Sequence, residues 1–355
     1  MLETVSQPDV YVGERVAIGV EIADSATRFT AMLAPIRATP HASDASEITA
    51  PQSQRRWYAR LPAPPSPIAA LDALHTLIER ALRESGFVVN TTPGALSIGV
   101  AFQGEVDAAQ GRILGMRSAE GWEEYPLAAR LAERCGGSVS IETATDAAAL
   151  VEAQRGAGRA QRSLLYALLA RNVTSAFVLD GRIAHGAHGR AGRLGHWFVA
   201  PDGPRCACGM RGHLDPLASA QSLVRNAIGR ASASDESTAA MLRIADGRAE
   251  AMTAAQVVQL AAQGDPAAGE VVGAAQAALA LAFANLIAVL DPGLIVVGGP
   301  LVEAGDAFFA PLNAQTQALC ADWAPVGTTA RIVPGALEPF AALAGALWLA
   351  AQPAG

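Results

Sequence analysis

Apolar residues follow two patterns along this chain. Short, nearly continuous runs come first, and repeats with helical spacing come later. Compact, β-branched runs are typical of buried strands. They predict a hairpin from residues 15–23 and 28–36, a third strand over 55–62 and a fourth over 95–102. The polar residues 38–53, which include Pro and Ser, predict a loop between the second and third strands.

Helical spacing begins after the prolines near residue 65, where leucines recur as far as a stop at Gly86. Two more helices, over 122–135 and 146–155, flank a short strand predicted at 138–142. Hairpins followed by strand–helix alternation indicate an α/β protein with mixed sheets. The later elements are strands over 163–170, 174–180 and 293–299, helices capped by Thr253 and Asp265, and a closing helix over 339–351.

The composition indicates a folded protein of two domains. The 355 residues are 51% hydrophobic and 17% charged, which allows a sizeable core. The longest apolar run, 277–290, contains Asn285 and is shorter than the ~20 residues that span a bilayer. The opening residues show no basic-then-apolar signal peptide. We therefore expect a cytoplasmic protein with no membrane partner.

The charge indicates which partners the chain can bind, and the cysteine content indicates its compartment. The chain has no lysine, so its 26 basic residues are all arginine, and its net charge is -7. An acidic chain without a basic run is not expected to bind nucleic acid directly. Its 4 cysteines are few and unevenly spaced, which indicates a reducing compartment rather than a disulfide framework.

One segment, residues 189–216, concentrates the candidate chemistry. His196, Cys206, Cys208 and His213 offer four zinc ligands within it. Thiolate and imidazole both bind zinc well, and a set of four forms a closed, structural site. The alternative is that the cysteines are inert and that His213 is a surface residue. We predict the zinc site, because spacing and ligand type agree.

The same segment carries a family resemblance. The element Arg193-Leu194-Gly195-His196, followed by the run from Cys206 to Asp215, resembles a hallmark of the ROK family of sugar kinases and sugar-responsive repressors. That hallmark is Glu-x-Gly-His followed by Cys-x-Cys-Gly-x-x-Gly-Cys-x-Glu. The resemblance covers the chain from about Arg15, because further segments follow in family order: residues 99–115, 121–131, 179–192, 291–306 and the closing helix.

The resemblance implies a fold and an assembly. The fold is the actin-like, ribonuclease H-like sugar-kinase fold, with two α/β domains, mixed sheets and an active site in the interdomain cleft. An N-terminal lobe over 15–137, completed by the 338–352 helix, would precede a C-terminal lobe over 138–337 that contains the zinc segment. A homodimer or homotetramer is implied as well.

The resemblance also implies roles for individual residues. His213 replaces the family's last metal-binding cysteine, and His196 would contact both zinc and sugar. Asp215 replaces a sugar-binding glutamate with the same chemistry, one methylene shorter. Arg193 replaces the other sugar-binding glutamate and reverses its charge. Arg193 either engages an anionic sugar derivative by a forked contact or pairs with a nearby carboxylate.

The nucleotide-binding and catalytic parts of the family pattern are lost. The first phosphate site, Asp-x-Gly-Gly-Thr in the family, reads EIADS over 21–25, and an aspartate there would repel phosphate. The second site, glycine-rich in kinases, has no glycine over 170–176. The family's catalytic Asn-Asp pair corresponds to Thr143 and Ala144. Asp146, two residues on, is either a shifted base or the cap of the helix it opens.

These losses predict a catalytically inactive pseudokinase that senses a sugar or an anionic sugar derivative and regulates transcription. Zinc is its expected structural cofactor, and ATP is not expected to bind. The residues before Arg15 are too few for the winged helix of family repressors, so we expect an effector core without its own DNA-binding domain that acts through a protein partner. If an upstream segment is missing, the chain is the effector domain of a repressor.

Two alternatives stay open. The first is an active ATP-dependent hexose kinase with displaced catalytic residues. The second is a structural protein in which zinc only holds the fold.

Overall fold

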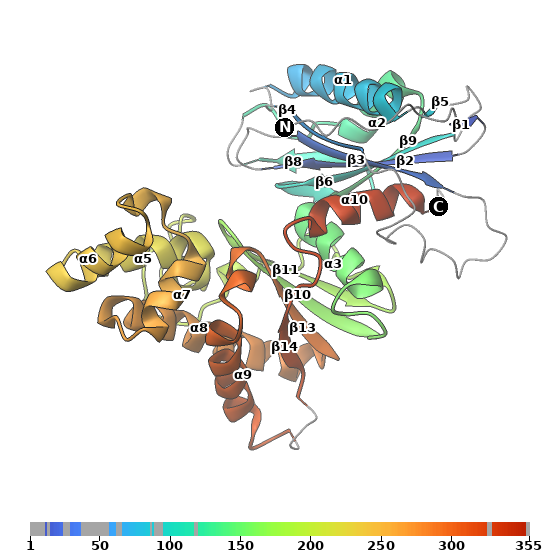
Figure 1. Ribbon diagram of the computed structural model, residues 1–355. Coiled ribbons are helices and arrows are strands. Elements are labelled where there is room, and N and C mark those ends of the chain that lie inside the picture. Colours follow the sequence, from blue (N-terminus) through green and yellow to red (C-terminus); the bar gives the residue numbers. More distant parts are fainter. Residues whose placement is uncertain are drawn as a thin grey trace. The chain divides into compact units, whose positions relative to one another are not determined.

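The computed structural model describes residues 11–12, 15–23, 29–36, 57–61, 66–85, 87–88, 95–116, 120–324 and 329–352. The chain forms two compact units. Unit 1 comprises Met1–Val151 with Phe340–Gly355, and unit 2 comprises Glu152–Pro339 (Figure 1). The chain therefore crosses between the units twice. The first crossing lies later than the predicted boundary at residue 137, because the strand that follows this boundary pairs with the sheet of unit 1.

Unit 1 is built on a five-stranded mixed sheet in the order β4-β3-β2-β6-β9. The predicted hairpin, third strand and fourth strand are confirmed. β2, β3 and β4 are antiparallel, whereas β6 and β9 continue the sheet in parallel. The bounds are β2 Arg15–Ile22, β3 Phe29–Ile36, β4 Trp57–Leu61, β6 Leu96–Phe102 and β9 Ser138–Thr143.

Two smaller strand pairings in unit 1 were not predicted. β1 (Tyr11–Val12) pairs in parallel with β5 (Phe87–Val88), and β7 (Glu105–Asp107) forms a hairpin with β8 (Arg112–Gly115). The loop predicted over 38–53 lies outside the described residues.

Helices cover both faces of the unit 1 sheet, as Figure 1 shows. α1 (Pro67–Ser85) and α2 (Leu127–Cys135) lie on one face, and α10 (Ala341–Ala351) lies on the other. The side chains of β2 alternate accordingly, because those at even positions join the core with α1 whereas Ala17 packs against α10. α3 (Ala144–Arg155) follows β9 and carries the chain across the first crossing.

Glycine allows the close approach of α10 to the sheet. A β-carbon built on Gly99 would lie 1.9 Å from the carbonyl oxygen of Ala346, and one on Gly19 would lie 2.4 Å from the backbone nitrogen of Leu347. The helix therefore packs directly against the backbone of β2 and β6, at a separation that only glycine permits.

Unit 2 contains a second five-stranded mixed sheet, in the order β12-β11-β10-β13-β14. β10 and β11, which match the strands predicted over 163–170 and 174–180, form an antiparallel pair, while β13 and β14 run parallel to β10. The short last strand was not predicted. The bounds are β10 Ser163–Leu169, β11 Val173–Leu179, β12 Arg182–Ile183, β13 Leu294–Gly298 and β14 Arg331–Pro334.

The region of unit 2 between β12 and β13 is mostly helical. The side chains of Thr253 and Asp265 cap α7 and α8, which confirms both predicted N-caps. The helices are α4 Asp215–Ala218, α5 Ala220–Ala231, α6 Asp235–Ile244, α7 Ala254–Ala262, α8 Pro266–Leu290 and α9 Asp306–Cys320, with 3₁₀ helices η2 Leu194–His196, η3 Ala249–Ala251 and η4 Pro300–Ala304.

α8 is the central helix of unit 2. It extends over 25 residues, well beyond the apolar run at 277–290, and its length and composition would suit a membrane span. However, 67% of its most apolar window is buried inside the protein, and Phe283 is fully buried. These are the properties of a core helix.

Candidate metal centre and ligand site

The segment that carries the predicted metal ligands is anchored to the unit 2 core by two leucines. Leu194, in η2, and Leu214 are buried in the apolar cluster that includes Val173 of β11. Leu194 precedes His196 by two residues, and Leu214 directly follows His213. The core therefore fixes the positions of both histidines.

A tight turn brings the cysteines to these histidines. The N–H of Cys206 donates to the carbonyl of Met210 over 2.8 Å. Between them, Gly209 has a φ of 95°, a left-handed value that glycine adopts without strain. An antiparallel bridge joins Phe198 to His213. Backbone pairing thus holds residues 198–213 together without any contribution from a metal ion.

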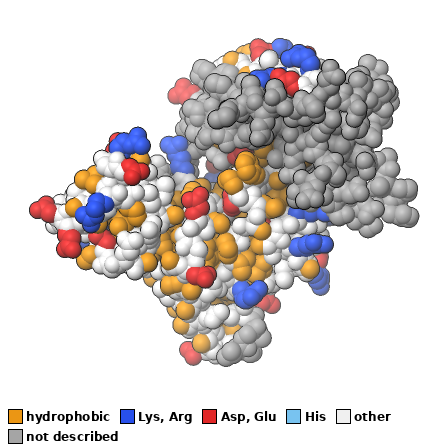
Figure 2. Space-filling view, in the orientation of Figure 1, with side chains coloured by type: hydrophobic (Ala, Val, Ile, Leu, Met, Phe, Trp, Pro, Cys, Tyr) orange, Lys and Arg blue, Asp and Glu red, His pale blue; other side chains and the backbone are white. Residues whose placement is uncertain are grey.

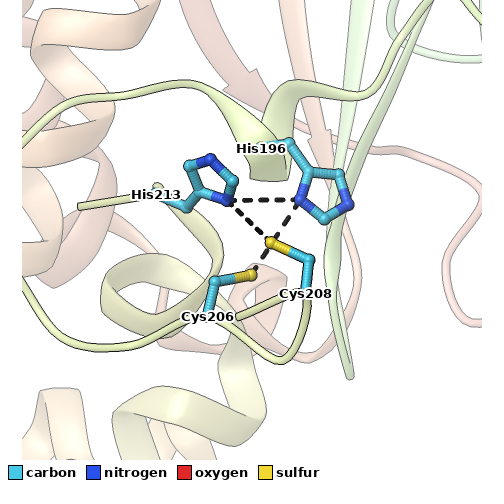
Figure 3. Close-up of side chains that lie close together, drawn as sticks. All are labelled: His196, Cys206, Cys208 and His213. Atoms are coloured by element: carbon cyan, nitrogen blue, oxygen red, sulfur yellow. Dashed lines mark hydrogen bonds between the residues drawn. The ribbon is translucent and has the colours of Figure 1, made fainter. Parts of the chain in front are cut away.

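The four predicted ligands converge on one point (Figure 3). Their ligand atoms all lie within 4.8 Å of one another. The Nδ1 atoms of His196 and His213 are 3.3 Å apart. The Sγ atom of Cys208 is 3.4 Å from Nδ1 of His213, and that of Cys206 is 3.9 Å from Nδ1 of His196. Tetrahedral zinc with ordinary bond lengths holds nitrogen ligands roughly 3.3 Å apart and nitrogen and sulfur ligands roughly 3.6 Å apart.

These distances and donor types fit a zinc ion. Burial raises the pKa of the Cys206 thiol, so the thiol stays protonated when no cation is near. A zinc ion favours the thiolate, and its binding releases protons. Two thiolates and two neutral imidazoles balance the charge of one Zn²⁺. Four protein ligands leave no open coordination position, so such an ion would brace the segment rather than perform chemistry.

The three predicted sugar-contacting residues surround η2. Arg193 is exposed at the start of this short helix, and His196 ends it. Figure 3 shows the second ring nitrogen of His196 pointing away from the other three metal-site side chains. Asp215 lies alongside, since a β-carbon on Gly195 would be 3.3 Å from the β-carbon of Asp215. The structure therefore brings these three residues to one place.

Asp215 also has a partner that sequence analysis missed. Its Oδ1 accepts a 2.6 Å hydrogen bond from the N–H of Val173, which is 42 positions away in the chain. Val173 is the first residue of β11, directly after the turn that leads from β10. No local sequence signal reveals this bond, because the two residues meet only through the tertiary fold.

The β10–β11 turn, residues 170–172, begins the segment that was predicted to match the family's second phosphate loop. The N–H of Ala170 donates to the carbonyl of Asn172 over 3.2 Å, and the turn contains no glycine. A phosphate loop needs free backbone N–H groups and room for close approach. Here the N–H of Val173 is already bound by a carboxylate, which would repel phosphate.

Thr143 and Ala144, the positions predicted to match the family's catalytic pair, lie where β9 ends and α3 begins. α3 begins at Ala144, two residues earlier than predicted, because the Thr143 hydroxyl accepts from the N–H of Asp146 over 3.0 Å. The interpretation of Asp146 as the helix cap is therefore wrong. Asp146 lies in the first turn, where its Oδ2 accepts from the Thr143 hydroxyl over 2.7 Å. Ala144 is buried with Ala101 and Ala346.

Comparison with known proteins connects these observations. A sequence profile of the ROK family matches residues 52–353. The chain belongs to the ROK family. A glucokinase of Streptomyces coelicolor is 27% identical over 296 residues, which are 83% of this chain and 90% of that enzyme. The DNA-binding transcriptional repressor Mlc of Escherichia coli is 29% identical over 213 residues, 60% of this chain and 50% of the repressor.

Structural comparison agrees. The crystal structure of a ROK family glucokinase from Streptomyces griseus, in complex with glucose and AMPPNP, has a TM-score of 0.74 to this protein and is 26% identical to it. The alignment covers 95% of this chain and 100% of that one. The predicted two-domain sugar-kinase fold is confirmed. Because ROK proteins include both kinases and repressors, family membership by itself leaves the reaction open.

Proposed function

We propose that this ROK protein is a pseudokinase that binds a sugar or a sugar derivative and acts as a regulator without transferring phosphate. The β10–β11 turn carries the proposal. It lacks glycine, and Asp215 holds the N–H of Val173 at 2.6 Å. A carboxylate that occupies a backbone donor of this turn removes part of the cradle that a nucleotide phosphate requires.

The residue at the family's catalytic position supports the same function. Ala144 replaces the aspartate of the family pattern and cannot accept a proton. Its side chain is only 3% exposed, in a cluster with Ala101 and Ala346. Loss of a general base typically lowers a rate by ~10²–10⁴-fold. Of the first phosphate site, Asp24 and Ser25 lie outside the described residues.

The active hexose kinase is the competing function, with Asp146 as its displaced base. The test is ATP-dependent phosphorylation of a hexose panel, with an authentic glucokinase as positive control. We expect no turnover above the background without protein. Turnover that the substitution Asp146→Ala abolishes would overturn the proposal.

The class of ligand depends on Arg193. This residue is exposed at the start of η2, the helix that His196 ends, and it replaces a glutamate of the family's sugar site. A guanidinium recognises carboxylates and phosphates through paired hydrogen bonds. We therefore propose an anionic sugar derivative, a sugar phosphate or sugar acid, as the ligand.

Thermal-shift assays with neutral hexoses, sugar phosphates and sugar acids test this assignment. Anionic sugars should stabilise the wild-type protein, and Arg193→Glu should abolish that effect. The matched control is Arg190→Glu, which changes an exposed arginine of the same segment and should leave the response unchanged. Stabilisation of the wild type by neutral hexoses but not by anionic ones would contradict the assignment.

Zinc, in this proposal, is structural and is held by His196, Cys206, Cys208 and His213. Reduced cysteine ligands suit the cytoplasm, where we propose that the protein works. A broad metabolite panel separates a sensor from a purely structural protein, since only a sensor is stabilised by a small molecule. If no compound raises the melting temperature, zinc serves the fold alone.

A regulator also needs a surface through which it signals, and unit 2 exposes apolar side chains. Figure 2 shows hydrophobic side chains spread over the visible face of unit 2, with charged ones scattered among them. Val289 is 76% exposed, Trp323 52% and Leu319 49%. Exposed apolar groups of this size support self-association or a protein partner. We propose a homodimer or homotetramer that acts on a protein partner and does not bind nucleic acid directly.

A further inference from the structure

A fully buried carboxylic acid stands at the first crossing of the chain between its two units. Glu152 is 0% exposed and is the first residue of unit 2. The return crossing comes directly after Pro339, the last residue of that unit. Glu152 thus lies where the chain enters unit 2, and Pro339 lies where the chain leaves it.

The Glu152 side chain accepts hydrogen bonds from two backbone segments, one beside each crossing. Its Oε1 accepts a 2.8 Å hydrogen bond from the N–H of Leu337, in the segment that leads to the return crossing. Its Oε2 accepts a 2.8 Å bond from the N–H of Ala157, just after α3. One carboxylate thus uses both of its oxygens on two segments that are 180 positions apart in the sequence (337 − 157).

Two glycines make room for this carboxylate. A β-carbon on Gly156 would lie 1.9 Å from Oε2 of Glu152, and one on Gly335 would lie 3.1 Å from Oε1. Any larger residue at position 156 would displace the carboxylate. The local sequence is thus adapted to hold an acid at this point.

A second acid lies close to the first. Oε1 of Glu338 accepts a 2.7 Å hydrogen bond from the hydroxyl of Tyr166, a fully buried residue of β10. Burial raises the pKa of Glu152, the backbone donors at Ala157, Leu337 and Ala336 lower it, and the negative charge of Glu338 raises it further, with a net rise.

The cations nearby do not offset this rise. Arg155 lies one turn further along α3, and its own pKa is lowered by burial and by Arg159. Among the described residues, Glu152 has no ion-pair partner. The return segment contributes the Glu338 charge, and β10 contributes the Tyr166 hydroxyl.

We propose that Glu152, with Glu338 and Tyr166, forms a proton-dependent latch that fastens the return segment, residues 335–338, to the end of α3. The ionised carboxylate accepts both backbone N–H groups. Uptake of one proton from solvent turns one oxygen into a hydroxyl, a much weaker acceptor than a carboxylate oxygen, so the hydrogen bond from one of the two N–H groups weakens. The latch opens without any covalent change, and it does not depend on the proposed sugar-sensing function.

The sign of the pH effect separates the latch from acid unfolding. Because the folded-state pKa of Glu152 is raised, the group contributes stability that is fully present below its unfolded pKa. That contribution is lost as the pH rises through the folded pKa. Acidification from neutral pH therefore opens the latch locally while this group favours the folded state as a whole.

Hydrogen exchange tests the latch. Peptides that contain Leu337 and Ala157 are followed from pH 8 to about pH 4, just below the ordinary pKa of a glutamate side chain, with rates corrected for intrinsic pH dependence. We expect protection of at least one of the two to fall about tenfold or more as the pH drops, because a hydrogen bond to a charged group is lost. Peptides from β10 should keep their protection. Protection of both latch peptides that is constant over this range would overturn the proposal.

Two variants and a control identify the groups. Glu338→Gln keeps an acceptor for Tyr166 but removes the neighbouring charge. The midpoint of the pH-dependent change in protection should therefore move to lower pH. Glu152→Gln should abolish the pH dependence and leave one N–H without its acceptor. Glu270→Gln, on the exposed side of α8 where Glu270 pairs with Arg230, should leave the midpoint unchanged. If Glu152→Gln does not fold, the Glu338→Gln variant alone tests the latch. A midpoint that is unchanged in Glu338→Gln would then overturn the proposal.

Discussion

His213 is the residue that most changes the character of the proposed metal site. It replaces a cysteine of the family pattern, and its Nδ1 lies 3.3 Å from that of His196. A neutral imidazole in place of a thiolate makes the ligand set neutral overall with Zn²⁺, whereas three thiolates would leave a net negative charge. Because His213 is only 5% exposed, the neutral set suits its surroundings better.

The first prediction concerns the thiol ligands. Cys208→Ser should lower bound zinc, measured by mass spectrometry of the metal, from about one ion per chain to near zero. It should also destabilise unit 2 by at least about 2.7 kcal/mol, the contribution of a ligand present at 100 times its Kd. His213→Cys should keep the ion, because it restores the family's donor.

Cys135→Ser is the matched control for this prediction. Burial and the nearby Glu79 raise the pKa of the Cys135 thiol to about 11, so it stays protonated and belongs to no described metal cluster. Its loss should leave the zinc content unchanged. Equal zinc content in Cys208→Ser and the wild type would exclude the metal site.

The second prediction concerns Asp215, the residue that binds the β10–β11 turn. Asp215→Ala should lower the free energy of unfolding by roughly 1.5–3 kcal/mol, the usual contribution of a hydrogen bond to a charged group. Asp202→Ala, which removes an exposed carboxylate from the same segment, should change it by less than about 0.5 kcal/mol. Urea unfolding measures both. Equal effects would show that the bond to Val173 contributes nothing.

At the scale of elements, glycine determines where α10 can pack. The prediction is that Gly99→Ala destabilises unit 1 by roughly 3 kcal/mol or more, because its β-carbon would lie 1.9 Å from the carbonyl oxygen of Ala346. Gly273→Ala, on an open side of α8 with no atom within 4 Å of the added carbon, should stabilise by about 0.5–1 kcal/mol. Thermal unfolding of the two variants is the measurement, and similar melting temperatures would contradict this packing.

Elements with strong local patterns could be predicted from the sequence, and those fixed by tertiary packing could not. The β2–β3 hairpin and the caps at Thr253 and Asp265 follow from local rules. α9 was missed because Pro311 interrupts its pattern, although Phe308 and Leu312 are fully buried and hold the helix in place. β14 has only four residues, too few to show a period.

The candidate site, too, has parts that could be predicted from the sequence and parts that could not. The four candidate metal ligands could be predicted as a group because they lie within one short segment of the chain, and the structure brings their ligand atoms together. The bond from Asp215 to Val173 and the contacts of Glu152 were not found, because they join segments that only the sheet of unit 2 brings together. The residue types of the candidate site could therefore be predicted from the sequence, whereas the contacts between distant segments could not.

At the scale of the whole molecule, we propose that this ROK fold keeps the ligand-recognition parts of a kinase and lacks its phosphate-transfer parts. The fold is present, and the four predicted metal ligands lie together. A carboxylate holds the N–H of Val173 in the β10–β11 turn, and Ala144 occupies the position predicted for the catalytic base. In the proposed function, this division gives a sensor that has no kinase reaction.

Calorimetric titration of the zinc-loaded protein with an ATP analogue and, in parallel, with a panel of neutral and anionic sugars tests the proposed function. We expect heat of binding for at least one sugar or sugar derivative and none for the nucleotide, with the sugar bound or absent. Saturable nucleotide binding, strengthened by a hexose, would contradict the proposal of a sensor without kinase activity.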